Sequence, residues 1–432
     1  MTLNKEIEKE IRKKSRIKGF ITPDYERYCF SNIPSTILSF FGIKSKRPIL
    51  PSDVYENVLR DKKPTKVILL LIDGFGFNSW LKHSQNYKFF HLFNQRGLVS
   101  PLTSIFPATT ASAITTINSG LTTQEHALHE WTVYFKEIDK TINTLPFTDI
   151  YEEGRDKLLE QGVNPQILFK GKTNYQILEK SGVKTFTFNN ETYAYSVYSK
   201  LVFKGSRTIP FKNGSDLAIK LRKELIEQKG PAYFYIYWDT IDAMAHDYGP
   251  DSKEYLTELK GISSTFMKEF LKKIKPDVAK ETIFIIAADH GEARVFPEKT
   301  IFLNQYQKLK DSFQKGQNGK PILPIGGPRD VFLHIKPEKL EETLDFLRQE
   351  LRGKAEILKT NEALKMGLFG TGKVKKEFLD RIGNLLILPY KNKTVWYKYP
   401  RIKPHKFLGH HGGLSEEEML VPFAIAKLSD LL

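Results

Sequence analysis

Three runs of apolar and aromatic residues in this sequence each end next to residues that can bind a metal ion. The runs cover residues 67–72, 233–238 and 282–288, and their composition is typical of buried strands. The carboxylates and the imidazole that follow them are Asp73, Asp239 with Asp242, and Asp289 with His290. Open α/β sheets place their ligand sites at the carboxyl ends of parallel strands. We therefore expect a metal site at one edge of a sheet.

The spacing of these residues suits a divalent metal ion. Asp242 and His246 are four residues apart and so face the same side of a helical turn. Oxygen and imidazole ligands of this kind suit zinc, with manganese as the second choice. Taken alone, such a pair is more often a surface pair, and a histidine after a strand is often only hydrogen-bonded there. The recurrence of the pattern favours the metal site.

A threonine-rich segment after Pro107 has the composition of a helix start that packs close to a sheet. Thr109 and Thr110 precede a run of small residues that ends at Gly120. A hydroxyl at a helix N-terminus lies beside unpaired N–H groups and the positive end of the helix dipole, which favours phosphate. A metal ion could activate the same hydroxyl as a nucleophile. The alternative is an ordinary threonine N-cap.

Two further imidazoles lie in a glycine-flanked loop, at His410 and His411 in the run Gly-His-His-Gly-Gly of residues 409–413. Glycines allow the backbone to approach a ligand closely. The plain alternative is a pair of surface histidines.

The composition is that of a globular protein with an excess of positive charge. Of the 432 residues, 66 are lysine or arginine and 50 are aspartate or glutamate, so the formal net charge is +16. Because the lysines are scattered along the chain, this charge can simply solubilise the surface. The alternative is a bias towards an anionic substrate; nucleic-acid binding stays open, but no dedicated motif supports it. No apolar run is long enough to cross a membrane, so no membrane partner is expected. The single cysteine, Cys29, and the charged start of the sequence predict a cytoplasmic protein.

Strand and helix patterns alternate over residues 65–130 and again over 232–290. This alternation predicts an α/β fold with a mostly parallel central sheet covered by helices. A helix is expected at residues 3–18. The expected division is an N-terminal helix and loop-rich extension at 1–64, a core at 65–294 and 406–432, and a smaller inserted α+β lobe at 295–405.

The order of the motifs resembles that of the alkaline phosphatase superfamily, and most closely its type I phosphodiesterase/nucleotide pyrophosphatase family. The resemblance covers residues 65–425 in motif order. It implies an alkaline phosphatase-like core with two divalent metal ions. One ion would be held by Asp242, His246 and His411, and the other by Asp73, Asp289, His290 and the hydroxyl oxygen of Thr110.

The resemblance also selects between adjacent residues that could each fill the same role. Thr110 is preferred to Thr109 as the nucleophile because it lies ten residues before Gly120, as the family nucleophile does relative to its helix-end glycine. His411 is preferred to His410 because the family ligand directly precedes a glycine. The implied reaction is attack of the threonine on phosphorus, followed by hydrolysis of a phospho-threonine intermediate.

The implied activity is that of a phosphodiesterase or nucleotide pyrophosphatase acting on a small phosphorylated substrate. The alternatives are a phosphomonoesterase of the same superfamily, or a non-catalytic anion- or nucleic-acid-binding protein on this fold. The family often has an asparagine after the nucleophile that helps to hold the phosphoryl oxygen, whereas residues 126–131 contain none. Arg294 and Arg329 are candidate phosphate contacts, with surface or salt-bridged arginines as the alternative.

Overall fold

The structure is a computed structural model that describes residues 5–59 and 63–432. Helix α1 (Lys5–Lys14) buries Ile7 and Ile11, which are four residues apart and therefore share one face. The predicted helix starts at residue 3, so its first two residues lie outside the described residues. The next described segment, up to residue 59, contains α2 (Ile33–Phe40) and the short α3 (Glu56–Leu59) between loops.

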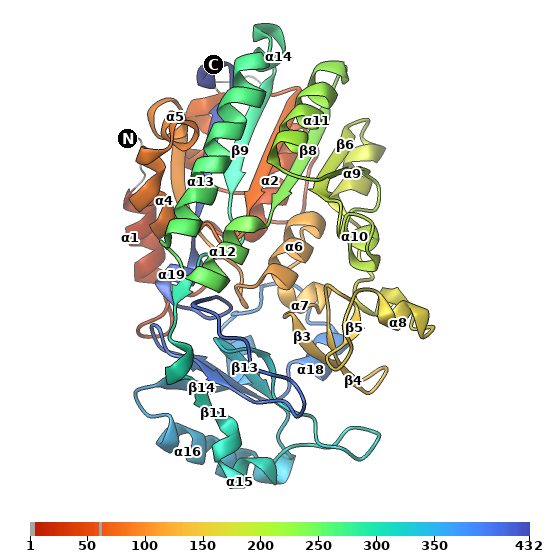
Figure 1. Cartoon of the computed structure of the whole chain (residues 1–432), viewed down its shortest axis with the longest axis vertical. Coiled ribbons are helices and arrows are strands. Elements are labelled where there is room, and N and C mark those ends of the chain that lie inside the picture. Colours follow the sequence, from red (N-terminus) through yellow and green to blue (C-terminus); the bar gives the residue numbers. More distant parts are fainter. Residues whose placement is uncertain (1–4, 60–62) are drawn as a thin grey trace.

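A seven-stranded sheet forms the centre of the larger part of the molecule (Figure 1). From edge to edge its strands are β2 (Leu98–Thr103), β18 (Leu420–Lys427), β9 (Thr282–Ala287), β1 (Lys66–Ile72), β8 (Ala232–Trp238), β6 (Lys184–Asn190) and β7 (Arg207–Phe211). β18 is antiparallel to both of its neighbours, and the other pairings are parallel. The predicted mostly parallel sheet is therefore confirmed.

The three central strands β9, β1 and β8 are buried along their whole length, which explains their unbroken apolar sequences. Their register brings their carboxyl ends to the same level: Ile72 of β1 is opposite Trp238 of β8, and Leu71 is opposite Ala287 of β9. The polar residues that follow the strands consequently meet at one edge of the sheet.

Helices cover both faces of this sheet (Figure 1). On one face, Phe89 of α5 (Lys88–Arg96) stacks on Phe266, the residue after α13 (Lys253–Thr265), and both rings contact Phe284 of β9. On the other face, Tyr175 of α9 (Asn174–Lys180) stacks on Tyr233 of β8. The sheet is thus the middle layer of three.

A second, four-stranded antiparallel sheet lies below the central one in Figure 1. Its strand order is β12 (Ile325–Gly327), β13 (Asp330–Leu333), β15 (Leu385–Pro389) and β14 (Ala355–Lys359). Helix α16 (Leu340–Glu350) packs Leu344 and Leu347 into a separate apolar cluster with this sheet. The sheet falls within the predicted lobe at 295–405, although the domain boundaries themselves stay a prediction.

A small three-stranded sheet of β3 (Thr132–Phe135), β4 (Lys140–Asn143) and β5 (Thr148–Asp149) lies next to the four-stranded sheet, with β3 against β12. In the part of the chain that the structure describes, no helix has the length and apolar character needed to span a bilayer.

Candidate active site

Asp73 and His290 meet at the carboxyl edge of the central sheet. Asp73 directly follows β1, and its Oδ1 lies 3.2 Å from His290 Nε2. The hydroxyl of Tyr237 in β8 donates a hydrogen bond to Asp73 Oδ2, and this bond holds the carboxylate in place. Asp73, Asp242 and His290 each offer a ligand atom within 4.8 Å of the others. The structure therefore brings together carboxylates and an imidazole from three separate strand ends.

A second group of potential ligands shares Asp242. It comprises Asp242, His246, Glu292 and His411, whose ligand atoms all lie within 4.8 Å of one another. Asp242 and His246 come from the same helix, α12 (Thr240–Tyr248), and Asp242 Oδ1 is 3.4 Å from His246 Nε2. His411 Nε2 reaches the same oxygen at 3.7 Å.

Backbone carbonyls orient both histidines of this second group. Nδ1 of His246 is hydrogen-bonded to Gly409 O at 2.8 Å, and Nδ1 of His411 to Ala108 O at 3.0 Å. These bonds leave Nε2 of each ring directed at Asp242, as in histidines that ligate a metal. His410 belongs to neither group of potential ligands.

Two further aspartates that follow strands, Asp289 and Asp239, lie outside the first group of Asp73, Asp242 and His290. Asp289 Oδ2 is 3.6 Å from His290 Nε2, while its Oδ1 accepts hydrogen bonds from the N–H groups of Gly74 and His290. Asp289 thus lies beside the first group without being within 4.8 Å of all its members. Asp239 accepts a hydrogen bond from Tyr193 at 2.8 Å and is not part of either group.

Thr110 is the first residue of helix α6 (Thr110–Ser119), and its hydroxyl faces the first group. Oγ1 of Thr110 lies 3.3 Å from His290 Nε2 and donates a 3.5 Å hydrogen bond to Asp73 Oδ2. Thr109 is the N-cap: its hydroxyl accepts from the Ser112 N–H and donates to the His129 carbonyl. The two neighbours therefore have different roles, and only Thr110 contacts the candidate metal ligands.

The charges of this region are unbalanced in the absence of a cation. Burial, reinforced by neighbouring carboxylates, raises the pKa of Asp289 and of Glu292 well above the usual range. Burial alone would lower the pKa of His290, but Asp289 and Asp73 outweigh it and raise that pKa to about 10. Asp73 Oδ1, Asp242 Oδ1 and Asp289 Oδ2 are buried and have no hydrogen-bond partner within residues 5–59 and 63–432. Divalent cations fit these residues because they would satisfy the unpaired oxygens.

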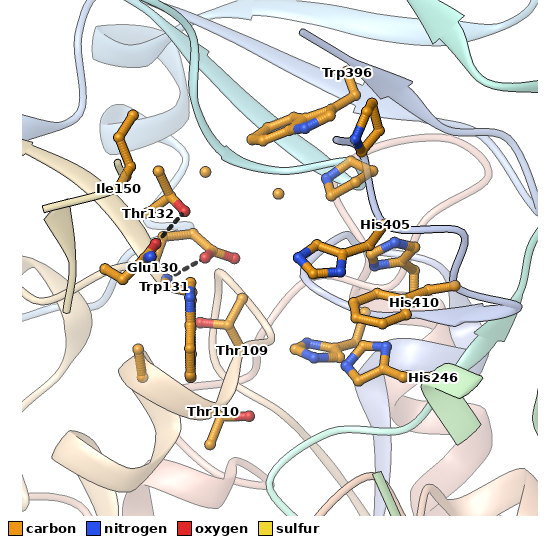
Figure 2. A pocket seen from close by; sticks show the side chains of 18 of the residues that line it. Thr109, Thr110, Glu130, Trp131, Thr132, Ile150, His246, Trp396, His405 and His410 are labelled. Carbon is orange, nitrogen blue, oxygen red and sulfur yellow. Dashed lines mark hydrogen bonds between the residues drawn. The ribbon is translucent and has the colours of Figure 1, made fainter. Parts of the chain in front are cut away.

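A cavity of about 520 Å³ opens beside Thr110 and the second ligand group. Figure 2 shows Thr110 at one end, His246, His405 and His410 along one side, and Trp131 with Glu130 along the other. Trp396 lies at the far end, and the remaining lining residues include Ile150, Tyr397, Tyr399, Ile402 and Phe407. The cavity is thus mostly aromatic and apolar away from the ligand groups.

A second cavity of about 390 Å³ lies on another side of Thr110 and Asp242. It is lined by more polar residues, among them Arg155, Asn189, Thr192 and Asp239. The guanidinium of Arg155 lies 5.8 Å from the centre of the Tyr193 ring. Trp131 and Thr110 line both cavities, so a group bound at Thr110 would have space on two sides.

A family model described as type I phosphodiesterase / nucleotide pyrophosphatase matches residues 67–414. The chain belongs to this family. It is accordingly a phosphoric ester hydrolase of a metal-dependent family, and the group of Asp73, Asp242 and His290 is a possible metal site. None of the curated proteins matches the sequence significantly.

Solved structures of the same family share this fold. Murine ectonucleotide pyrophosphatase / phosphodiesterase 5 is 17% identical, with a TM-score of 0.63 over 84% of this chain and 88% of that chain. An inactive variant of the murine protein, in complex with AMP, is 16% identical over the same shares with a TM-score of 0.63. The human protein is 17% identical, with a TM-score of 0.62 over 84% and 87%.

The two arginines considered as phosphate contacts are occupied elsewhere. Arg329 is completely buried and donates from Nε and Nη2 to Glu418, at 2.9 and 2.6 Å. Arg294 donates to the carbonyl of Pro250 at 2.9 Å. Arg329 is therefore a buried, salt-bridged arginine and not a phosphate contact.

Sequence reasoning missed Glu292 and the aromatic cavity. Glu292 lies only three residues after Asp289, so its closeness to a strand end was a usable signal. Trp131 and Trp396 gave no signal because they are far apart in the sequence and meet only in the folded chain.

Proposed function

We propose that this chain hydrolyses phosphodiester or nucleotide pyrophosphate bonds in a metal-dependent reaction, with Thr110 as the nucleophile. The observation that carries the proposal is the position of Thr110 Oγ1, 3.5 Å from Asp73 Oδ2 and 3.3 Å from His290 Nε2. At this point the hydroxyl faces the candidate ligands, the N-terminus of α6 and both cavities.

Two divalent cations are proposed, each held by the set of ligands that the family resemblance implies. Asp242, His246 and His411 would hold one, and Asp73, Asp289 and His290 would hold the other together with the Thr110 oxygen. When bound, these cations supply positive charge that stabilises the phosphoryl group in the transition state and lower the pKa of the attacking hydroxyl.

The residues of the chain supply the nucleophile and the path of its proton. Thr110 Oγ1 attacks phosphorus while its proton passes to Asp73 Oδ2, which accepts its hydrogen bond. The bond from phosphorus to the leaving oxygen breaks as the bond to Thr110 forms, and the product is a phospho-threonine. The backbone N–H of Ala111, in the first turn of α6, is available to a phosphoryl oxygen. Water then attacks phosphorus while the bond to Thr110 Oγ1 breaks, and the phosphate product is released. Thr110 Oγ1 recovers the proton from Asp73, and the proton lost by the water neutralises the leaving oxygen of the first step.

The two cavities support a small substrate with a group on each side of phosphorus. The aromatic cavity suits a ring system, and Arg155 in the other cavity suits an anionic or hydrogen-bonding group. A nucleotide fits this description, and the complex of the murine neighbour with AMP supports it. A phosphomonoester would leave one of the two cavities empty.

The proposal is tested with three chromogenic substrates: bis-p-nitrophenyl phosphate, p-nitrophenyl thymidine monophosphate and p-nitrophenyl phosphate, each with zinc or manganese. We expect both diesters to be hydrolysed faster than the monoester, and Thr110→Ala to lose nearly all turnover. The matched control is Thr371→Ala, which makes the same change at an exposed threonine. Activity that survives in Thr110→Ala would refute the nucleophile, and a preference for the monoester would favour a phosphomonoesterase.

A further inference from the structure

Glu292 lies among the candidate metal ligands, although the motif order that identifies the family gives it no role. One of its carboxylate oxygens is within 4.8 Å of the ligand atoms of Asp242, His246 and His411. The side chain is only 2% exposed. It is therefore a buried acidic side chain that faces the second ligand group.

Neither carboxylate oxygen of Glu292 has a hydrogen-bond partner among the described residues. His290 Nδ1 lies 3.9 Å from Oε1, which is too far for a hydrogen bond, and that nitrogen is hydrogen-bonded to the Gly291 carbonyl instead. A buried carboxylate without partners is costly, so this position requires either a bound cation or a proton.

The backbone around Glu292 holds it against the histidine loop. The short strand β10 (Ala293–Arg294) begins directly after Glu292 and pairs with β17 (Gly409–His410). A Cβ atom at Gly409 would lie 2.9 Å from Glu292 Oε2 and 2.5 Å from the Ala245 carbonyl. The same Gly409 accepts the hydrogen bond from His246 Nδ1. The glycine thus makes room for the carboxylate and orients one of its neighbours.

We propose that Glu292 is a fourth protein ligand of the cation that Asp242, His246 and His411 would hold, and that it shifts this site from zinc towards manganese. This inference rests on the metal-dependent function proposed above. Catalytic zinc sites use three protein ligands and keep one position open for water or substrate. Two carboxylates and two imidazoles would fill a tetrahedral site. A cation that accepts six ligands, such as manganese, keeps open positions beside four protein ligands, and its preference for oxygen suits the added carboxylate.

The first test is calorimetric titration of metal-free protein with manganese chloride and with zinc chloride. We expect Glu292→Gln to weaken manganese binding at one of two sites about tenfold or more, and zinc binding less, so that the preference for manganese falls. Glu417→Gln, which removes the same charge from an exposed residue, serves as the control and is expected to keep both dissociation constants. Unchanged affinities for both metals in Glu292→Gln would overturn the proposal.

The second test compares melting temperatures with and without manganese. In metal-free protein, Glu292→Gln removes one of several buried carboxylates that repel one another, so we expect a higher melting temperature than in the wild type. In the presence of manganese, we expect the variant to gain less than the wild type. A variant that gains as much as the wild type would show that Glu292 is a buried protonated side chain and not a ligand.

Neither test depends on turnover. If Thr110→Ala kept full hydrolysis, the proposed nucleophile would fail while a manganese defect in Glu292→Gln would still stand. If Thr110→Ala were inactive and Glu292→Gln bound both metals normally, the proposed function would stand and the fourth ligand would be refuted.

Discussion

The imidazole rings of His290 and His411 stack face to face, with ring centroids 3.7 Å apart and planes inclined by 14°. His290 lies shortly after the central strand β9, whereas His411 directly follows β17 (Gly409–His410), much later in the sequence. Each ring is also hydrogen-bonded through Nδ1 to a backbone carbonyl, that of Gly291 and of Ala108 respectively. The two ligand groups are therefore held in a fixed relation by the backbone.

We expect removal of metal by a chelator to abolish hydrolysis and to lower the melting temperature by several degrees. The reason is that the buried Asp73, Asp289 and Glu292 and the partly buried Asp242 lie close together and have too few positive partners without a cation. The measurement is thermal unfolding and activity before chelation, after chelation, and after manganese or zinc is added back. Full activity in metal-free protein would contradict the expectation.

We expect Asp73→Asn to lower kcat about a hundredfold or more, because the change removes the acceptor of the Thr110 proton and a charged ligand. The sheet is expected to remain folded, since asparagine has nearly the same shape. Activity, metal content and circular dichroism are measured together. Asp277→Asn is the matched control, because it makes the same change at an exposed residue of helix α14 (Pro276–Lys280) that lines neither cavity. A loss in Asp277→Asn as large as that in Asp73→Asn would contradict our assignment.

We expect Trp396→Ala to raise KM for p-nitrophenyl thymidine monophosphate about three- to tenfold, with little change in kcat. The side chain lies at the far end of the aromatic cavity, away from Thr110, so its loss removes ring contacts with the substrate but no reacting group. Steady-state kinetics give both constants. Leu379→Ala, a truncation of an exposed apolar side chain, is the control. An unchanged KM would show that the substrate does not reach this end of the cavity.

Buried His126 makes the stability of the chain depend on pH. Leu128 N–H donates to Nδ1 at 3.0 Å, so the proton of the neutral ring is on Nε2, which lies 3.1 Å from Thr116 Oγ1. Burial, with a smaller contribution from Lys375, lowers the pKa of His126 from 6.5 to about 3. Between these values the unfolded chain binds a proton that the folded chain does not. The contribution of neutral His126 to the free energy of unfolding is thus fully present above pH 6.5 and is lost as the pH falls towards 3.

We therefore expect the wild type to lose about 2 kcal/mol more stability than His126→Gln between pH 6.5 and pH 4.5, because the unfolded chain, already half protonated at His126 at pH 6.5, takes up the rest of this proton over the interval. Urea unfolding of metal-free protein at the two pH values measures this difference. Glutamine at this position can still accept from Leu128 and donate to Thr116. Identical pH dependence in the two proteins would contradict a neutral buried His126.

We expect Arg329→Met to destabilise the chain by about 3–5 kcal/mol, because it leaves the carboxylate of Glu418 buried without its partner. Glu418 also accepts hydrogen bonds from the N–H groups of Gly413 and Ser415, just after His411. Metal affinity should consequently fall together with stability. Chemical unfolding and metal titration are measured against Arg352→Met, where the arginine is exposed. A normal free energy of unfolding in Arg329→Met would show that the ion pair is not structural.

The parts of the site that follow strand ends could be predicted from the sequence. Apolar strands impose a recognisable pattern, and the end of each strand marks where Asp73, Asp242 and His290 must lie. The choice of Thr110 over Thr109 needed the family pattern, because either threonine can begin a helix. The cavity was not predictable, because β3 and β16 (Val395–Trp396), which bring Trp131 and Trp396 to it, are set by tertiary packing.

The position of β18 between β2 and β9 has a consequence for synthesis of the chain. Six strands of the sheet precede β18 in sequence. Within the sheet, β18 pairs with β2 on one side and with β9 on the other, so β2 is connected to the remaining strands only through β18. Until residues 420–427 have left the ribosome, β2 and β9 present open hydrogen-bonding edges and apolar faces. His411 also emerges late, so a nascent chain holds Thr110 well before it holds all the metal ligands. Activity is therefore expected to arise only after this late segment has been translated and inserted.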